Sequence, residues 1–400
     1  MSSQSTANVK LQSEINRLTG RHVALLALLM ACGFIVVGQL YVTIPMVAGI
    51  AAAFGVDPAQ AALIGTAFGV AYAAGFLLFG PLSDRYGRKR MILIGLMATA
   101  VATALVGLAT SFGLLLAARA VQGLAASIFP PVALSLVAEE LPPHHRPLGV
   151  SLMSFAFLGA APLSQLFVVH TGSSLSTIMF ELAPLYLLGA VGLYLAVAAK
   201  NTAPGVGSGT QGNRFASLVR DPGIIAAWTA AVTVLFGFVS FYSGTQVFGV
   251  NIGVDLQTVR LIGLPPLLLT FAAAPMTRRY GAPVTARIGL SLAALAIGMG
   301  AIASPTAIMV ASGALSAGVA FAVPGLIATV AGRATNANRG LALAIYSFAL
   351  FLGASFAPPV AQALAGIGIV PLSLVPAALL LAAVVGLTIG IRRPHPSNPS

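Results

Sequence analysis

The amino-acid sequence predicts an all-α integral membrane protein with twelve transmembrane helices, arranged as two parallel six-helix repeats. Three observations support this fold class. Of the 400 residues, 58% are hydrophobic and 7% are charged, whereas soluble domains carry about 25% charged residues. The apolar residues form twelve long runs, and two distant parts of the chain resemble one another. The composition excludes a water-soluble globular enzyme.

Each of the twelve apolar runs is long enough to cross a hydrocarbon layer of about 30 Å as a helix. A transmembrane β-barrel would instead need segments of about ten alternating residues, which this sequence lacks. The predicted spans are residues 23–48, 60–82, 91–110, 113–138, 147–169, 178–199, 223–250, 257–275, 284–303, 305–331, 340–365 and 370–391.

Polar segments separate the spans into two bundles. We expect the N-terminal tail to be retained in the cytoplasm, because the apolar run that follows is too long for a signal-peptide core. The linker starts with a Gly/Ser-rich stretch and ends with RFASLVRDP, where we expect a short interfacial helix. The predicted parts are the tail 1–22, the bundle 23–199, the linker 200–222, the bundle 223–391 and the tail 392–400.

The basic residues predict the orientation of the spans. Twelve spans place both tails on one side, and the positive-inside rule makes that side the cytoplasm of a plasma or bacterial inner membrane. Of the 20 Lys and Arg residues, 18 fall in the tails or in connectors on that side. Arg260 is assigned to the outer side and Arg119 to the interior of a span. The net charge of +12 therefore reflects topology, and we expect no nucleic-acid site.

The two bundles carry an internal repeat. GPLSDRYGRKRMILIGL, which begins at Gly80, aligns with APMTRRYGAPVTARIGL, which begins at Ala274, at an offset of 194 residues. A second match, at an offset of 193 residues, pairs the SFA sequence at 154–156 with that at 347–349. Parallel six-helix repeats of this kind can rock about a central site.

Three motifs carry a resemblance to a known family. GPLSDRYGRKR, from Gly80 to Arg90, resembles the signature loop between spans 2 and 3 of the major facilitator superfamily. LLLAARAVQGLAAS, at 114–127, is similar to the span 4 motif of that family's proton-coupled drug exporters, and GAAPLSQ, at 159–165, loosely resembles their span 5 motif. The resemblance covers essentially the whole chain and implies the twelve-span drug or metabolite:proton antiporter branch.

At the signature loop we predict a gating latch. Gly87 allows a tight turn, because glycine enters positive φ freely. Asp84 can accept hydrogen bonds from Arg85 or Arg88, or face the positive end of span 11, which the resemblance places nearby. The latch would hold the outward-open state and separate as the bundles rock; alternatively, the arginines serve orientation alone. Further acids placed to pair with this arginine cluster are Glu139 and Glu140.

Arg119 places a charge inside span 4, roughly 9 Å from the outer end of the helix. Burying it costs at least about 2.5 kcal/mol, so such residues usually face a partner or a water-filled path. The residue at the equivalent position of the second half is Ser312, so the repeat does not require an arginine. We expect Arg119 and the nearby Gln122 to carry a coupling or substrate charge. The alternative is that Arg119 snorkels to the outer headgroups.

Proton coupling lacks an obvious intramembrane carboxylate. Glu181, near the outer end of span 6, is interpreted as interfacial, whereas Glu139 or Asp84 could titrate as the latch opens. A cavity without fixed negative charge favours neutral or anionic substrates. The family resemblance implies that spans 1, 4, 7 and 10 line this cavity, with spans 2, 5, 8 and 11 at its sides. Aromatic and amide side chains suit drug-sized molecules. The candidate cavity residues are Gln39, Tyr41, Gln122, Gln165, Phe241, Tyr242, Gln246, Phe321, Tyr346 and Phe348.

These observations favour a secondary transporter that exports small hydrophobic or anionic compounds, such as drugs or metabolites, in exchange for protons. The sequence has no P-loop and no metal-ligand cluster, so we expect neither an enzyme nor a cofactor or metal. One alternative is an importer or facilitator of an anionic metabolite, and another is a membrane sensor or scaffold that transports nothing. The expected partners are a small-molecule substrate, protons and lipid, and we expect a monomer.

Overall fold

The structure, a computed structural model of the chain, is helical in the part that it describes. Within that part, twelve helices or pairs of helices are long and apolar enough to cross a membrane, which confirms the predicted fold class. The residues described are 18–142, 145–197, 211–249, 251–335 and 338–392, without the side chains of 80, 81, 83–85 and 211–214.

The first six spans, which we call the N-half, lie close to their predicted positions, except that the helix of the first span ends at Gly38, whereas the prediction extended it to residue 48. The fourth span is divided into two helices, and a 3-10 turn and a short helix follow the first span. The elements are α2 (Gly20–Gly38), η1 (Ile44–Met46), α3 (Val47–Phe54), α4 (Pro58–Tyr86), α5 (Arg88–Gly107), α6 (Phe112–Ala126), α7 (Phe129–Glu140), α8 (Arg146–Thr171) and α9 (Leu175–Ala196).

The last six spans, which we call the C-half, follow a short helix in the linker. Here the second span of the half is divided, by a 3-10 segment. The elements are α10 (Gln211–Val219), α11 (Pro222–Phe248), α12 (Leu256–Gly263), η3 (Pro265–Leu269), α13 (Thr270–Tyr280), α14 (Ala282–Met299), η4 (Gly300–Ile302), α15 (Pro305–Arg333), α16 (Arg339–Ile367) and α17 (Ile369–Arg392).

Prolines explain where the divided spans break. A proline lacks a backbone N–H and clashes with the preceding turn, so a helix tends to end before it. The pair at 130–131 occupies the first turn of α7, and the pair at 265–266 opens η3. Span 1 leaves its helix after Gly38, ahead of Pro45 in η1. Because of this break, the backbone carbonyl of Gln39 does not accept a hydrogen bond within α2.

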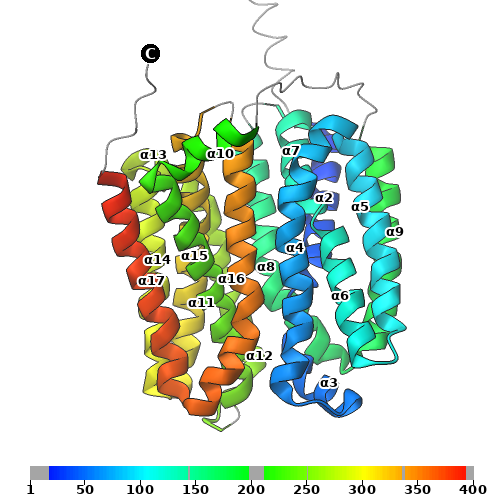
Figure 1. Cartoon of the computed structure of the whole chain (residues 1–400), viewed down its shortest axis with the longest axis vertical. Coiled ribbons are helices and arrows are strands. Elements are labelled where there is room, and N and C mark those ends of the chain that lie inside the picture. The colour runs from blue at the N-terminus through cyan, green and yellow to red at the C-terminus, as the bar shows by residue number, and fades with distance from the viewer. Residues whose placement is uncertain (1–17, 143–144, 198–210, 250, 336–337, 393–400) are drawn as a thin grey trace, which may run out of the picture.

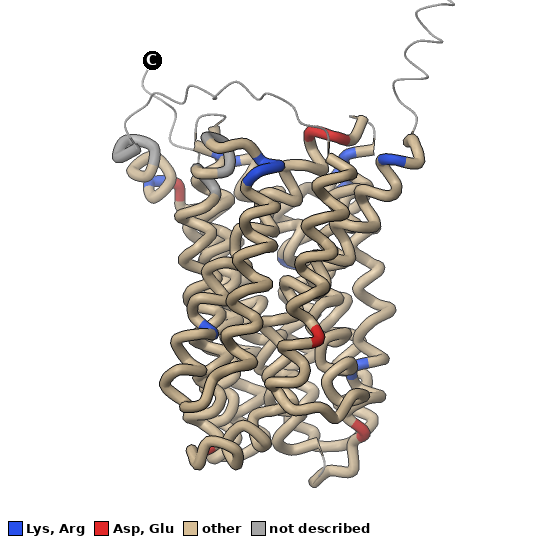
Figure 2. Tube along the Cα trace, turned by 90° about the vertical axis from the view of Figure 1, so that its right-hand side faces the viewer, with Lys and Arg blue, Asp and Glu red and all other residues tan. Residues whose placement is uncertain are grey.

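The two halves lie side by side, with their helices along the long axis of the molecule (Figure 1). The helix α10, expected from the linker sequence, lies across one end, where α17 also ends. Lys and Arg residues gather at this same end (Figure 2), which we call the basic end. The other end, which contains Phe54, Ser111 and Asp255, is called the opposite end.

The backbone shows the repeat at one turn in each half. Gly87 precedes α5 with φ 87°, and Gly281 precedes α14 with φ 88°. This conformation is accessible to glycine at little cost and strains other residues. The two copies of the aligned segment therefore share a turn geometry as well as a sequence pattern.

The halves meet along a seam formed by α4 against α16 and by α8 against α12 and α13. At the first contact, Thr66 Oγ1 donates a hydrogen bond of 2.8 Å to the carbonyl of Ser355, and Tyr72 meets Phe351 edge to face with ring centroids 4.9 Å apart. A Cβ atom on Gly69 would lie 2.1 Å from Ser355 Oγ. The close approach of α4 and α16 therefore requires glycine at this position.

Candidate functional site

Arg119 is fully buried on α6, among neutral hydrogen-bond acceptors. Its Nη2 atom donates to the carbonyl of Gln39 at 2.8 Å, and its Nη1 atom donates to Oε1 of Gln122 at 2.6 Å and of Gln39 at 3.3 Å. Nε donates to the carbonyl of Ile64 at 3.4 Å, and the guanidinium lies over the Phe68 ring, 4.4 Å from its centroid. The side chain points into the N-half, so it does not snorkel to the headgroups.

A second layer of hydrogen bonds holds these acceptors. Gln39 Nε2 donates to the Tyr186 hydroxyl at 2.8 Å, which donates in turn to the carbonyl of Ile35 at 2.9 Å. Gln122 Nε2 donates to Thr103 Oγ1 at 2.8 Å. We name the set below the Arg119 cluster. It connects four of the six spans of the N-half, and the hydrogen bond of Arg119 to the Ile64 carbonyl adds a fifth span. None of its members is a carboxylate. The cluster consists of Arg119, Gln39, Gln122, Thr103 and Tyr186.

Local backbone structure makes this cluster possible. Because α2 ends at Gly38, the carbonyl of Gln39 is not needed for a continuing helix and can accept from the arginine. Two neutral side chains and two backbone carbonyls replace the water that the guanidinium would bind outside. Such hydrogen bonds compensate part of the cost of burying a charge.

Arg260 lies near the opposite end, on the side away from the basic residues, as the sequence predicts, but its burial was not predicted. It is part of α12 and is 2% exposed. Nη2 donates to Gln246 Oε1 at 2.7 Å, and Nε donates to Gln165 Oε1 at 3.3 Å. Gln165 belongs to the N-half and Gln246 to the C-half, so the arginine joins the halves across the seam. Its position inside the predicted span 257–275 was the signal that could have identified it.

The predicted cavity residues fall into separate groups. Gln39 and Gln122 belong to the Arg119 cluster, whereas Gln165 and Gln246 hold Arg260. In the C-half, the hydroxyls of Tyr242 and Ser312 lie 3.1 Å apart, and the Tyr346 hydroxyl donates to the carbonyl of Val323 at 3.3 Å. Of the remaining residues, Tyr41 and Phe241 are buried and Phe321 and Phe348 are half-buried.

A cavity of about 640 Å³ lies elsewhere, at the opposite end of the N-half. Parts of η1, α3, α5, α6, α8 and α9 line it, and they include Met46, Phe54 and Leu115. None of the ten predicted cavity residues contributes to this lining. A central substrate cavity between the halves therefore stays a prediction.

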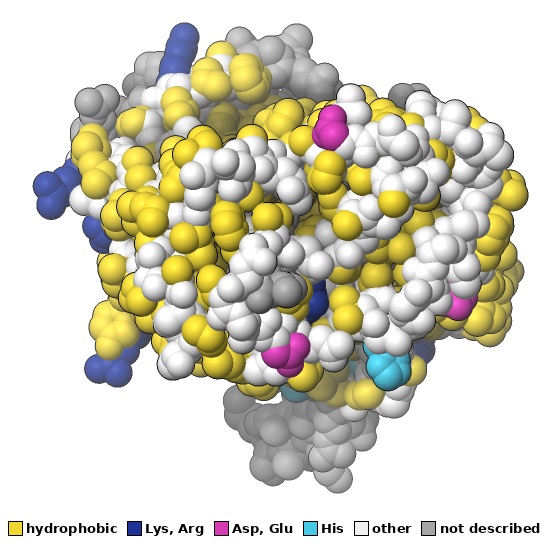
Figure 3. Space-filling view, turned by 90° about the horizontal axis from the view of Figure 1, so that it is seen from below, with side chains coloured by type: hydrophobic (Ala, Val, Ile, Leu, Met, Phe, Trp, Pro, Cys, Tyr) yellow, Lys and Arg dark blue, Asp and Glu magenta, His cyan; other side chains and the backbone are white. Residues whose placement is uncertain are grey.

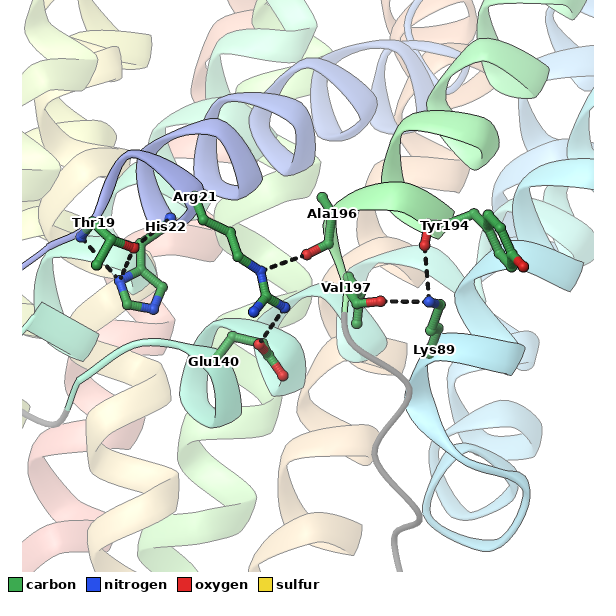
Figure 4. A network of polar contacts seen from close by, with 8 residues as sticks. All are labelled: Thr19, Arg21, His22, Lys89, Glu140, Tyr194, Ala196 and Val197. Atoms are coloured by element: carbon green, nitrogen blue, oxygen red, sulfur yellow. Dashed lines mark hydrogen bonds and ion pairs between the residues drawn. The ribbon is translucent and has the colours of Figure 1, made fainter. Parts of the chain in front are cut away.

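At the basic end, charged side chains tie the helices of the N-half to one another (Figure 4). Arg21 Nη2 lies 3.4 Å from Glu140 Oε2, and its Nε donates to the carbonyl of Ala196 at 3.0 Å. Lys89 Nζ donates to the carbonyls of Tyr194, at 2.8 Å, and Val197. The two cations thus bind carbonyls at the end of α9, where the helix leaves its last acceptors without partners.

The residues of the predicted latch are only partly described. Arg88 Nη1 forms an ion pair with Glu139 Oε1, which joins α5 to α7. The side chains of Asp84 and Arg85 lie outside the described residues. The ion pairs of Glu139 and Glu140 both join helices of the N-half, so a latch between the halves stays a prediction.

The two remaining acids of interest lie away from the Arg119 cluster. Glu181 is exposed on α9, and its predicted interfacial position stays a prediction. In the C-half, Asp221 caps the start of α11 and accepts a hydrogen bond of 2.8 Å from Arg333 Nε, at the end of α15. This ion pair lies at the basic end and also connects helices of one half.

Comparison with known proteins identifies the family. The sequence matches the profile of the Major Facilitator Superfamily over residues 29–269 and 258–400, which is nearly the whole chain. The chain belongs to this superfamily. Membership in the superfamily and the twelve apolar helices identify an integral membrane protein and confirm the resemblance inferred from the signature loop.

Facilitator-family relatives match shorter stretches. An uncharacterized MFS-type transporter of Mycobacterium tuberculosis is 42% identical over 87 residues, which are 22% of this chain and 15% of that protein. The Multidrug resistance protein 3 of Bacillus subtilis is 39% identical over 77 residues, 19% of this chain and 15% of that protein. The matched part thus spans less than a fifth of each relative. The first is a transporter by name, and the second is named for multidrug resistance. Membership in the superfamily identifies a transport protein and not an enzyme.

The same facilitator fold is found among solved structures. The crystal structure of the human organic anion transporter MFSD10 (TETRAN) superimposes with a TM-score of 0.71 over 92% of this chain and 100% of that chain. The sequence identity is 17%. The likeness supports the fold and carries no information on the substrate.

Proposed function

We propose that this facilitator-family protein is a secondary transporter that works by alternating access. The observation that carries the proposal is the seam between two repeated halves. Each half has its own buried polar interior, while the contacts across the seam include a glycine-based helix approach, an edge-to-face pair of aromatic rings and a few hydrogen bonds. Two such units can rock against each other without unfolding either one.

Neutral or anionic compounds are the proposed substrates. The buried charges described inside the spans are Arg119 and Arg260, and their hydrogen-bond partners are amides and carbonyls. A cationic drug would meet like charge in this interior, whereas an organic anion or a neutral amphipathic molecule would not.

Export in exchange for protons is the proposed mode. It rests on the span 4 motif around Arg119 and on the relative that is named as a multidrug resistance protein. Glu139 is the proposed proton acceptor, because protonation would break its ion pair with Arg88 at the basic end. We place this end, with both tails, on the cytoplasmic side of a plasma or bacterial inner membrane, because the basic residues gather there.

Two measurements on the full-length protein test this function. For alternating access, spin labels are placed in pairs across the seam at each end, in a background where Cys32, which is buried, is replaced by serine. Two inversely related distance populations at the two ends are expected. A single fixed distance at both ends would contradict the proposal and favour a sensor or scaffold.

For coupling, the protein is reconstituted in liposomes with carboxyfluorescein as an anionic probe and Nile red as a neutral one. A proton-linked exporter should move a probe against its gradient only when a pH difference is imposed. Flux that follows the probe gradient alone would indicate a facilitator instead. Glu139→Gln should abolish the response to the pH difference, with Glu181→Gln, at an exposed carboxylate, as the matched control.

A further inference from the structure

Arg260 brings a positive charge into the seam without an ion pair in the described part of the chain. Its side chain is 2% exposed, and its acceptors are the amide oxygens of Gln165 and Gln246. Among the residues that the structure describes, no carboxylate forms an ion pair with it. A buried charge held only by neutral dipoles is costly, and it gains more from a negative partner than an exposed charge does.

The acid nearest in sequence does not supply that partner. Asp255 lies at the start of α12, where Oδ1 accepts from the backbone N–H of Gln257 at 3.1 Å and Oδ2 from that of Thr258 at 3.2 Å. The Thr258 hydroxyl also donates to Oδ2, at 2.5 Å. Asp255 is therefore occupied as a helix cap and is exposed, while Arg260 points into the seam.

The guanidinium of Arg260 retains unused donors. It has five N–H groups, and in the described part of the chain Nε and Nη2 donate one hydrogen bond each. Nη1 donates no hydrogen bond there. A fully buried Nη1 would then be a buried atom without a partner, and it is not one. Nη1 therefore borders accessible space. In Arg119, by contrast, Nε, Nη1 and Nη2 all donate.

Arg260 lies where a small molecule can reach it from the opposite end of the protein. The opposite end of the molecule is hollowed near its centre, with Lys or Arg atoms visible at the bottom of the hollow (Figure 3). Arg260 lies one turn from the start of α12 at this end. Arg260 keeps 2% exposure, whereas Arg119 has none.

We propose that Arg260, Gln165 and Gln246 form a binding site for the carboxylate group of an organic anion, on the seam between the halves. A planar carboxylate matches the fork of Nη1 and Nη2 and accepts two charge-assisted hydrogen bonds. Gln246 can turn its amide to donate from Nε2, which has no hydrogen bond within the described part. The site rests on the proposed transport function, for which it names the substrate class and a residue distinct from Arg119.

Binding at this site changes a contact within the C-half and keeps the contact between the halves. Arg260 Nη2 donates to Gln246 at 2.7 Å, whereas Nε donates across the seam to Gln165 at 3.3 Å. Charge-assisted bonds to a carboxylate are shorter and about twice as strong as neutral ones. A carboxylate on Nη1 and Nη2 therefore replaces the Gln246 oxygen at Nη2, and the hydrogen bond between α8 and α12 is retained.

Thermal melting of the full-length protein in lipid nanodiscs tests the site. The probes are benzoate and octanoate, each compared with its neutral amide, benzamide or octanamide. In the wild type, at least one carboxylate should raise Tm by about 2 °C more than its amide. Arg260→Gln should remove this difference, while Arg279→Gln, at an exposed arginine on α13, should retain it.

Two results would overturn the proposal: no carboxylate–amide difference in the wild type, or a difference that survives in Arg260→Gln. Should Arg260→Gln fail to fold, Arg260→Lys replaces it, because lysine keeps the charge and loses the planar fork. Benzoate affinity should then fall by about tenfold, and unchanged affinity contradicts the site. The spin-label distances are measured without any anion, so failure of this site leaves alternating access to be judged separately.

Discussion

The two halves fill the same position with different chemistry. In the N-half, Arg119 donates to the carbonyl of Ile64 in span 2, and in the C-half the equivalent Ser312 donates to the carbonyl of Val259 in span 8, at 2.7 Å. The repeat thus places a donor from the fourth helix of each half against the backbone of its second helix. The hydrogen bond from the fourth to the second helix is therefore common to both halves, whereas at this position only the N-half carries a charge.

At the basic end, each half has an ion pair between its first and fourth spans, and the acid and the cation exchange places between the halves. In the N-half, the cation Arg21 lies near the start of the first span and its acid Glu140 at the end of the fourth. In the C-half, the acid Asp221 precedes the first span and its cation Arg333 ends the fourth. Both pairs join the same two spans of their half. Opposite charge arrangements therefore satisfy one architectural requirement.

The largest expected effect on stability is a difference between substitutions at Arg119 in the N-half and at Ser312 in the C-half. Arg119→Leu leaves the acceptors of the Arg119 cluster without their donor, and we expect unfolding to become easier by about 3–5 kcal/mol. Ser312→Ala removes one neutral hydroxyl and should cost about 1 kcal/mol. Denaturant titration of each variant in detergent measures both. Equal losses would mean that the N-half does not depend on its charge.

A smaller difference is expected between the two ion pairs. Asp221→Asn keeps a helix cap but leaves Arg333, whose side chain is 18% exposed, beside a neutral partner, and we expect a loss of about 2 kcal/mol. Arg21→Gln removes a side chain that is 52% exposed, so less than about 1 kcal/mol is expected. Melting curves at low and high salt measure the two losses. A greater loss of stability for Arg21→Gln than for Asp221→Asn would contradict the expectation that the more buried ion pair contributes more.

The two positive-φ glycines should instead behave alike. Gly87→Ala and Gly281→Ala each force a side chain into a strained conformation, with an expected cost of about 1–2 kcal/mol. Because the sites are far apart, their effects should add in the double variant. Melting temperatures of the single and double variants check this. An unchanged melting temperature for one of the two single variants would show that the turn geometry is required in one half only.

The smallest effect concerns pH at the opposite end. The hydrogen bond from the Thr258 side chain, followed by the backbone N–H of Gln257, lowers the pKa of Asp255 below its ordinary value. A lowered folded-state pKa contributes stability above the unfolded-state pKa of about 4, and this contribution is lost as pH falls through the folded-state pKa. We expect Tm to depend slightly less on pH between about 5 and 3 in Asp255→Asn than in the wild type. An unchanged profile would contradict the role of this cap.

The sequence predicts the spans well because their signal is local. Length and continuous hydropathy decide whether a segment can cross a bilayer. The breaks at the prolines 130–131 and 265–266 were not predicted, because both lie inside spans that were predicted as continuous. The family follows from the loop between Gly80 and Arg90, where charges and glycines stand at fixed spacing. Each of these features can be read without knowing which helices touch.

The site is less predictable because its contacts join distant helices. Arg260 and Gln165 are 95 residues apart, and no periodicity within either span indicates that they meet at the seam. Gln39 and Gln122 were interpreted as cavity residues, since a sequence does not say which face of a helix turns to its neighbours. In the structure both amides accept hydrogen bonds from Arg119, and their role in a substrate cavity stays a prediction.

The break after Gly38 has an evolutionary consequence. Arg119 binds the backbone carbonyl of residue 39 as well as its amide side chain. A carbonyl is present whatever amino acid occupies the position, so mutation can erase one of these bonds but not the other. We therefore expect related chains to tolerate drift at position 39 far more readily than at position 119, whose role no main-chain group can take over.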